Sequence, residues 1–378
     1  MPEHTEQFNT DTTATLAQVR DLMRHHLHAL WADPSRADLL PPMMLWGPPG
    51  VGKSSVIRDL CREEGIGFLD IRLAQREPVD LRGLPVPDGD RVNWLLSGEW
   101  PRDPDSRGII LFDELTAADR SLQVAAYELI LDRRLGDLYQ VPPGWYLCGA
   151  GNRGEDRAVA LTLSSALANR FCHLEVAPDL DAWLPWAHGR GVHPDVIGFL
   201  RFRPAAFFDM STNLERGWPS PRSWERVGLE MRLAEEHGLD DDGLRLLVTG
   251  LVGPGAATEL FAFRRWSMDI DDVQAMLRGE APVRVPRRGD QRYALCAALV
   301  NQLWHGPDGG APETLSGFFR VCRELPSDFA ALAMTDALAG ETAEDSEARA
   351  AALLGHPDFA DWSARHGTAF GAYQEAVV

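Results

Sequence analysis

Short runs of apolar residues alternate with segments of helical spacing over residues 41–180. The runs are about five residues long, as expected of strands that are buried on both faces of a parallel sheet. They are Met43–Trp46, Gly67–Ile71, Gly108–Phe112, Trp145–Ala150 and Cys172–Val176. Helical segments such as Ser54–Glu64 and Arg120–Leu135 lie between them. This alternation predicts an α/β domain in which helices cover a parallel sheet.

The pattern changes on both sides of this domain. Residues 1–40 indicate a polar tail and then a helix, whose apolar residues recur at helical spacing: Leu16, Val19, Met23 and Leu27. After residue 180 the strand signal fades, and helical character appears in Pro194–Arg201, Pro221–Glu236 and Leu244–Leu251. We therefore predict a helical domain over residues 181–300 and a helical C-terminal region of unassigned role over residues 301–378. Inside the α/β domain, the Pro- and Gly-rich segment Arg82–Asp90 predicts an insertion loop.

Composition and charge narrow the class of protein. The chain has 378 residues and a formal net charge of −19, and such a surface disfavours broad binding to phosphate backbones, although a local basic groove stays compatible. The chain has no apolar run of membrane-spanning length, and residues 1–20 lack the pattern of a signal peptide. We therefore expect a cytoplasmic protein that does not enter a membrane. Five cysteines at irregular spacing indicate neither a disulfide framework nor a zinc site.

The strongest chemical signal is a glycine-rich stretch between a predicted strand and a predicted helix. Residues 47–54 match G-x-x-x-x-G-K-[ST] at every defined position. Glycines let backbone N–H groups face phosphate oxygens, and the positive end of the following helix points at the same anion. Lys53 places a cation at the β- and γ-phosphates, and the Ser54 hydroxyl can bind Mg²⁺. The predicted nucleotide-binding residues are Gly47, Pro48, Pro49, Gly50, Val51, Gly52, Lys53, Ser54 and Ser55.

Two carboxylates follow the apolar run Gly108–Phe112. Asp113 would hold Mg²⁺, through a water molecule, and Glu114 would polarise the water that attacks the γ-phosphate. A solvated strand end is the alternative for a pair of acids alone. The glycine-rich loop in the same chain favours the catalytic interpretation, with ATP and Mg²⁺ as cofactors.

Three further polar residues are candidates for the same chemistry. Asn152 closes a predicted strand, where it could orient the attacking water, although Asn is also common in turns. Arg170 precedes the last strand and could reach the γ-phosphate of a neighbouring subunit, or it could simply form a surface ion pair. Arg222 follows the helix-start pair Ser220-Pro221. The helix dipole disfavours a cation there, so a bound anion would explain it, and plain exposure is the alternative.

The order of these motifs resembles the AAA+ superfamily, and within it the MoxR-like and dynein-related ATPases. Glu77–Pro85 resembles the D-L-x-G-x-P insertion of that branch, and Val124–Arg134 resembles its helix after the acidic strand. The resemblance covers roughly residues 40–235.

The resemblance implies a P-loop AAA+ core followed by a helical lid. It implies Asn152 as sensor 1, Arg170 as an arginine finger acting in trans and Arg222 as sensor 2. It further implies a ring, most often a hexamer, that remodels a client protein together with a von Willebrand A domain partner. Trp94 and Trp100 would then lie where such rings present segments to the central pore, with core packing as the alternative.

Two other functions remain open at this point. One is an AAA+ motor or restriction-type subunit that acts on nucleic acid, which the net charge disfavours. The other is a nucleotide-gated binding module with little turnover, against which the pair Asp113 and Glu114 argues. No motif in the sequence distinguishes ATP from GTP or names the client.

Overall fold

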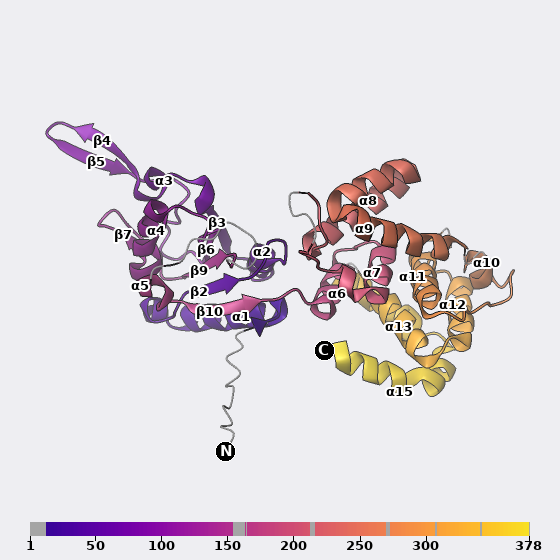
Figure 1. The fold of residues 1–378 in the computed structure, drawn as a ribbon. Helices are drawn as coiled ribbons and strands as arrows, with labels where there is room; N and C mark the ends of the chain where they lie inside the picture. The colour runs from indigo at the N-terminus through magenta and orange to yellow at the C-terminus, as the bar shows by residue number, and fades with distance from the viewer. Residues whose placement is uncertain are drawn as a thin grey trace, which may run out of the picture. The chain divides into compact units, whose positions relative to one another are not determined.

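The computed structural model describes residues 13–153, 163, 165–211, 216–269, 273–306, 308–340 and 342–377. The chain divides into two compact units, Met1–Pro178 and Asp179–Val378, and many of their elements are labelled in Figure 1. The predictions from sequence had divided it after residues 40, 180 and 300. Residues 1–12 of the predicted N-terminal polar tail lie outside the described residues.

A parallel six-stranded sheet organises the first unit (Figure 1). Its order is β1 (Thr13–Ala14), β10 (Cys172–Val176), β2 (Met43–Trp46), β9 (Trp145–Gly151), β6 (Gly108–Asp113) and β3 (Gly67–Arg72). Each neighbouring pair runs parallel. The predicted α/β class and all five predicted strands are therefore confirmed, with strand ends within one residue. The two-residue edge strand β1 was missed because so short a segment carries no periodicity.

Helices cover both faces of this sheet. They are α1 (Leu16–Ala32), α2 (Lys53–Glu63), α3 (Pro78–Arg82), α4 (Arg120–Asp132) and α5 (Ser165–Ala168), with 3₁₀ turns at Pro34–Asp38 and Leu73–Gln75. Helix α1 packs on α2, α2 contacts β3 and β6, and α3 contacts α4. The start of α1 is set by a capping box in which Thr15 and Gln18 exchange side-chain hydrogen bonds with each other's backbone N–H.

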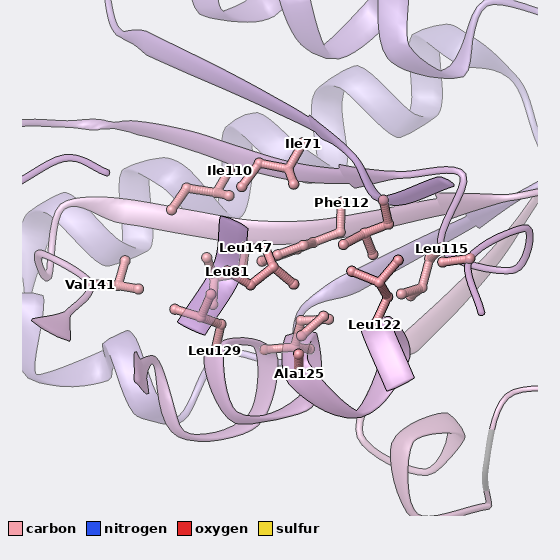
Figure 2. Close-up of a cluster of buried hydrophobic side chains, with 14 of the residues drawn as sticks. Ile71, Leu81, Ile110, Phe112, Leu115, Leu122, Ala125, Leu129, Val141 and Leu147 are labelled. Carbon is pink, nitrogen blue, oxygen red and sulfur yellow. The ribbon is translucent and has the colours of Figure 1, made fainter. Parts of the chain in front are cut away.

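The core beneath α4 shows why β6 is a continuous apolar run. Ile110 and Phe112 of β6 face Leu122, Ala125 and Leu129 of α4 (Figure 2), and all five are buried. The alternate residues of β6 point to the opposite face and are equally buried. Since neither face of β6 meets water, its sequence shows no polar alternation.

The segment predicted as an insertion loop at Arg82–Asp90 is not a loop. Strand β4 (Leu84–Asp88) pairs antiparallel with β5 (Arg91–Leu95), and this hairpin extends away from the rest of the first unit (Figure 1). The prediction failed because Pro85 and Pro87 normally exclude a central strand. A hairpin of two strands has only edges, and prolines are tolerated there. A second small hairpin, β7 (Arg134–Leu135) with β8 (Tyr139–Gln140), lies between α4 and β9.

The described part of the second unit is helical, as predicted. Its helices are α6 (Leu180–Gly189), α7 (Pro194–Phe202), α8 (Pro221–His237), α9 (Asp241–Asp269), α10 (Val273–Arg278), α11 (Gly289–His305), α12 (Pro312–Glu324), α13 (Ser327–Leu338), α14 (Ala343–Leu354) and α15 (Phe359–Val377), with a 3₁₀ turn at Pro204–Ala206. One core cluster gathers residues from α6 to α9, and another gathers residues from α10 to α15. Helix α11 joins them, because Ala294 belongs to the first cluster and Leu295 to the second.

A buried ion network also connects the two clusters. Asp336 of α13 pairs with Arg201 of α7, and its other carboxylate oxygen lies 3.3 Å from Nε2 of His188 in α6. Only 9% of the Asp336 side chain is exposed, so these charges interact with little screening by water. The C-terminal helices are thereby tied to α6 and α7 by charge as well as by apolar packing.

Helix α9 is the longest helix and is kinked at Gly253, whose φ is 80°, next to Pro254. Among the described residues, its segment Asp241–Arg265 is the one helix long and apolar enough to cross a membrane by length and composition. That is weak evidence, because core helices of soluble proteins pass the same test. Leu244, Val248 and other apolar residues of α9 belong to the first core cluster of the second unit.

Gly317 marks a close approach between α12 and α10. A Cβ atom at this position would overlap the carbonyl oxygen of Leu277, and backbone atoms cannot move aside easily. Gly317→Ala is therefore expected to lower the free energy of unfolding by about 1–3 kcal/mol, measured by urea denaturation. Gly371→Ala in α15, where nothing lies within 4 Å, is the control and should raise stability by up to about 1 kcal/mol. Equal effects of the two substitutions would contradict the close approach.

Candidate nucleotide-binding site

The glycine-rich loop connects the end of β2 to the start of α2. Gly52 is the N-cap of α2 and has φ 106°, a left-handed conformation that glycine adopts without strain. Gly47 lies against the end of β10, so that a Cβ atom there would overlap the carbonyl oxygen of Val176. These glycines let the loop fold tightly at the carboxyl edge of the sheet. The N-terminal turn of α2 follows directly, and its N–H groups can bind phosphate oxygens.

Lys53 brings a cation to the same edge. Its side chain is buried, and Nζ donates hydrogen bonds to the carbonyl oxygens of Gly47 (2.6 Å) and Pro48 (3.0 Å). Nζ also lies 3.2 Å from Oδ1 of Asn152, which follows the end of β9. Because β9 neighbours β2 in the sheet, the structure places Asn152 beside the loop that would hold the phosphates.

Ser54 and Asp113 form the second contact between the loop and the sheet. Oγ of Ser54 donates to Oδ2 of Asp113 at 2.5 Å, and Oδ1 of Asp113 accepts the N–H of Glu114 at 2.9 Å. A hydroxyl and a carboxylate are oxygen ligands of the kind that Mg²⁺ prefers, and Mg²⁺ commonly takes only one or two protein ligands beside phosphate and water. These two residues therefore fit a magnesium ion held together with a nucleotide.

Glu114 has an unusual backbone conformation at the end of β6. Its φ is 56°, in the left-handed region that costs most residues about 1–3 kcal/mol. The turn is held by hydrogen bonds from the N–H groups of Ala117 and Ala118 to the Glu114 carbonyl oxygen, and from Leu115 to the Ala150 carbonyl oxygen. Strain that the surrounding structure maintains in this way is common at functional sites. Here it turns the chain sharply directly after Asp113.

Thr116 is a site residue that the sequence analysis missed. It is buried, and its Oγ1 lies 3.2 Å from both the backbone nitrogen and the carbonyl oxygen of Asn152. It thus fixes the end of β9 to the turn after β6. Its only sequence signal is a hydroxyl group soon after the acidic pair, which is too common to be informative.

Asp70 of β3 is a second residue that was missed. Burial raises the pKa of its carboxyl group, the charge of Asp113 raises it further, and Arg72 and Arg58 oppose the rise. Both arginines lie 3.6 Å from Oδ2 of Asp70. The carboxyl groups of Asp70 and Asp113 are therefore close enough to interact, and Arg58 and Arg72 offset the charge of Asp70.

Arg170 lies at the opposite edge of the same sheet. It precedes β10, and the N–H of Cys172 donates to the carbonyl oxygen of Pro42, directly before β2. The glycine-rich loop follows the other end of β2. Arg170 is exposed and lines a cavity of about 210 Å³ with Arg133 and Tyr146 among others. Its guanidinium forms no ion pair within the part of the chain that the structure describes.

Arg222 lies in the second unit, in the first turn of α8. The predicted helix start is present, because Ser220 is the N-cap and forms a capping box with Ser223. Arg222 itself is exposed. The structure thus brings together Lys53, Ser54, Asp113, Glu114 and Asn152, leaves Arg170 at the far edge of their sheet, and places Arg222 in the other unit.

Side chains that could hold a metal ion without a nucleotide do not gather elsewhere in the described ranges. No three His, Cys, Asp or Glu side chains among those residues form such a group. All five cysteines are free, and four of them are buried. Burial of this kind is typical of cysteines that pack as small apolar residues.

Comparison with known proteins places this geometry in a class. Residues 43–122 match the family model described as the ATPase family associated with various cellular activities (AAA). That segment runs from the start of β2 to the first turn of α4 and includes both the glycine-rich loop and the acidic pair. The fold of the first unit is accordingly of the AAA P-loop class, and the described part of the second unit is helical.

Three of the matching solved structures are distantly similar to this chain. A point mutant of RuvB from Thermotoga maritima is 17% identical with a TM-score of 0.35, over 77% of this chain and 85% of that one. NtrX from Brucella abortus in complex with ADP is 17% identical with a TM-score of 0.33, over 79% of this chain and 64% of that one. A candidate ATPase from Cytophaga hutchinsonii is 14% identical with a TM-score of 0.31, over 63% of this chain and 87% of that one. Likenesses of this size carry no argument about function.

Proposed function

We propose that this protein hydrolyses ATP at the subunit interfaces of a ring and uses the energy to remodel a partner protein. One observation carries the proposal: Lys53, Ser54, Asp113 and Asn152 meet at the carboxyl edge of the sheet, whereas Arg170 stands exposed at the amino edge. A single chain thus offers a phosphate site on one edge and an arginine on the other. Subunits in a head-to-tail ring would join the two.

The residues at the carboxyl edge have distinct roles in the proposed reaction. Lys53 and the N-terminus of α2 bind the β- and γ-phosphates, while Ser54 and Asp113 would hold Mg²⁺, which neutralises charge on the transferring phosphoryl group. Glu114 accepts a proton from the attacking water as general base. Asn152, held by Thr116 beside Lys53, orients that water.

Arg170 supports action between subunits because it is too far from its own P-loop. The four residues of β2 separate the two edges, which amounts to about 13 Å at about 3.3 Å per residue. An arginine side chain cannot span that length and pass around the sheet. We therefore assign Arg170 to the γ-phosphate of the neighbouring subunit. By resemblance we assign Arg222 the role of sensor 2, which responds to the nucleotide bound by its own chain.

The biological setting is the part of the proposal that rests on resemblance alone. The segments Glu77–Pro85 and Val124–Arg134 resemble the MoxR-like branch, and we propose on that basis a cytoplasmic hexamer that works with a von Willebrand A domain protein. A pull-down from the native organism should recover such a protein with the full chain. Recovery of nucleic acid at low salt instead would favour a nucleic-acid motor.

ATP hydrolysis measured against protein concentration tests the proposal. Phosphate release per subunit is expected to rise with concentration, because each site is complete only between two subunits. Glu114→Gln is expected to lower turnover by about 10²- to 10⁴-fold and to leave binding of a fluorescent ATP analogue unchanged, since glutamine keeps the shape but cannot accept the proton.

The other outcomes contradict parts of the proposal. Hydrolysis that does not depend on concentration would mean that each chain acts alone. Full activity in Glu114→Gln would remove Glu114 as the base. Nucleotide binding without hydrolysis at any concentration would favour a nucleotide-gated binding module.

A further inference from the structure

The β4–β5 hairpin exposes apolar side chains on both of its faces. Leu84 and Leu95, which form one cross-strand pair, are 57% and 60% exposed, and Val92 and Trp94 on the other face are 55% and 44% exposed. Trp100, the other tryptophan considered for a pore role, is buried instead. Exposed apolar groups concentrated on one element indicate an interaction site. A hairpin of only two strands is also marginally stable in water by itself.

The turn of the hairpin determines which backbone groups face outward. Asp88 pairs with Arg91 across the two-residue turn of Gly89 and Asp90, and Gly89 has φ 65°. In such a hairpin the pair next to the turn exchanges both hydrogen bonds, and the pairs then alternate along the strands. The pairs that exchange no backbone hydrogen bonds are therefore Pro87 with Val92 and Pro85 with Trp94. Their backbone nitrogens point away from the partner strand.

The two free edges of the hairpin consequently differ. On β4 the outward nitrogens belong to Pro85 and Pro87, which have no N–H and cannot donate to an added strand. On β5 they belong to Val92 and Trp94, whose N–H groups have no hydrogen-bond partner among the described residues. One edge is thus closed to strand pairing and the other is open.

Charge and size identify the occupant of the open edge. All charged residues of the two strands and their turn lie at the tip, in Asp88, Asp90 and Arg91, so the rest of the hairpin is uncharged in a chain of net charge −19. Soluble proteins usually protect an open edge with charge, and beyond Arg91 this one has none. An uncharged apolar segment is the complementary partner of this uncharged stretch.

The area available favours a transient partner. Strand β5 has five residues, or about 17 Å of edge. One added strand of that length covers far less than the roughly 1,200 Å² that stable interfaces bury. An area this small does not support a permanent dimer through the hairpin. It does support repeated short-lived contacts.

We propose that β5 accepts an extended, uncharged, apolar polypeptide segment as a third strand, with backbone hydrogen bonds to Val92 and Trp94 and side-chain contacts to the same two residues. Main-chain pairing gives affinity that depends little on sequence, and the exposed Val92 and Trp94 side chains select apolar residues at alternate positions. The proposal rests on the proposed function only in naming that segment as part of the client. Binding itself needs no hydrolysis.

Peptide binding to the full chain, without nucleotide, tests this proposal. The probe is a short fluorescein-labelled peptide of alternating valine and threonine, followed by fluorescence anisotropy. The same peptide with alternate amides N-methylated, so that it cannot pair with a strand, is expected to bind at least about tenfold more weakly because two or more hydrogen bonds are lost. Equal binding of the two peptides would overturn strand addition.

Matched variants locate the site on one edge. Val92→Pro removes an outward N–H without touching the pairing to β4, and it should weaken binding about tenfold or more. Pro87→Val restores a donor on the closed edge, and it should add a second equivalent of bound peptide. Asp90→Asn at the turn is the control and should bind as the unchanged chain does.

Each contrary result has a definite meaning. Unchanged binding in Val92→Pro together with an unchanged stoichiometry in Pro87→Val would exclude the hairpin as the acceptor. A dimer that Val92→Pro dissociates would assign the edge to a second copy of this chain and overturn the client proposal. Neither result affects ATP turnover by Lys53 and Glu114, so the two proposals fail separately.

Discussion

Arg170→Ala is expected to lower ATP turnover by about 10³- to 10⁵-fold, the usual contribution of an arginine finger to phosphoryl transfer. Nucleotide binding to the same chain should change little, because Arg170 lies at the amino edge of the sheet and Lys53 at the carboxyl edge. Phosphate release and binding of a fluorescent ATP analogue measure the two effects separately. Arg62→Ala, an exposed arginine at the end of α2, is the control and should hydrolyse ATP normally.

Mixing two inactive variants tests whether Arg170 acts between subunits. Lys53→Ala removes the phosphate cation but keeps Arg170, and Arg170→Ala does the reverse. In mixed assemblies some interfaces contain an intact Lys53 from one chain and an intact Arg170 from the next, so activity should reappear. A mixture no more active than its two components would contradict action in trans, and normal turnover in Arg170→Ala would leave that residue a surface arginine.

Asp336→Asn is expected to lower the free energy of unfolding by about 3–5 kcal/mol, because it removes the carboxylate that pairs with the buried guanidinium of Arg201. Asp336 lies between α6 and α7 on one side and the C-terminal helices on the other. Urea denaturation of the whole chain measures the loss. A change below about 1 kcal/mol would mean that the pair is not buried in solution.

The pH dependence of the same contact has a defined sign. Burial by itself raises the pKa of Asp336, but Arg201 and His188 outweigh burial, and the pKa lies below its ordinary value. A carboxyl group whose pKa is lower in the folded state stabilises the fold above its unfolded pKa of about 3.9 and loses that contribution as pH falls through the folded value. The stability difference between the unchanged chain and Asp336→Asn should therefore shrink below about pH 4.

Two control variants distinguish the effect of a buried ion pair on stability from the effect of an exposed one. Glu259→Gln breaks the exposed pair with Arg203, which is worth about 0–1 kcal/mol at most. The combined change Arg201→Met with Asp336→Leu removes both charges and should recover much of the stability lost in Asp336→Asn, since apolar groups can replace a buried pair. If the combined variant lost as much free energy of unfolding as its two single substitutions added together, this account would be contradicted.

Local chemistry made part of the site recognisable from the residues alone. The loop Gly47–Ser54 has a defined spacing because backbone N–H groups, a lysine and a hydroxyl must converge on one phosphate chain. The strands around it were recognisable because burial on both faces removes polar residues from a short run. Asp113 and Asn152 were recognisable as polar residues at the carboxyl ends of strands, because those ends lie at the same edge of a parallel sheet.

The hairpin shows where local signals mislead. Pro85 and Pro87 argued for a loop, because proline cannot donate in a sheet ladder. They occupy pairs of a two-stranded hairpin that exchange no backbone hydrogen bonds, so no backbone N–H is needed at these positions. Only the register of β4 on β5 distinguishes these two situations, and register is a property of the pair of strands.

The amino-acid sequence by itself determined the parallel sheet, the phosphate loop, the acidic pair and the helical character of the second unit, because each depends on neighbours along the chain. Tertiary structure alone decided the contacts of Thr116 and Asp70, the place of Arg170 at the far edge and the burial of Asp336. Those features depend on which distant segments the fold brings side by side, and neither spacing nor composition contains that information.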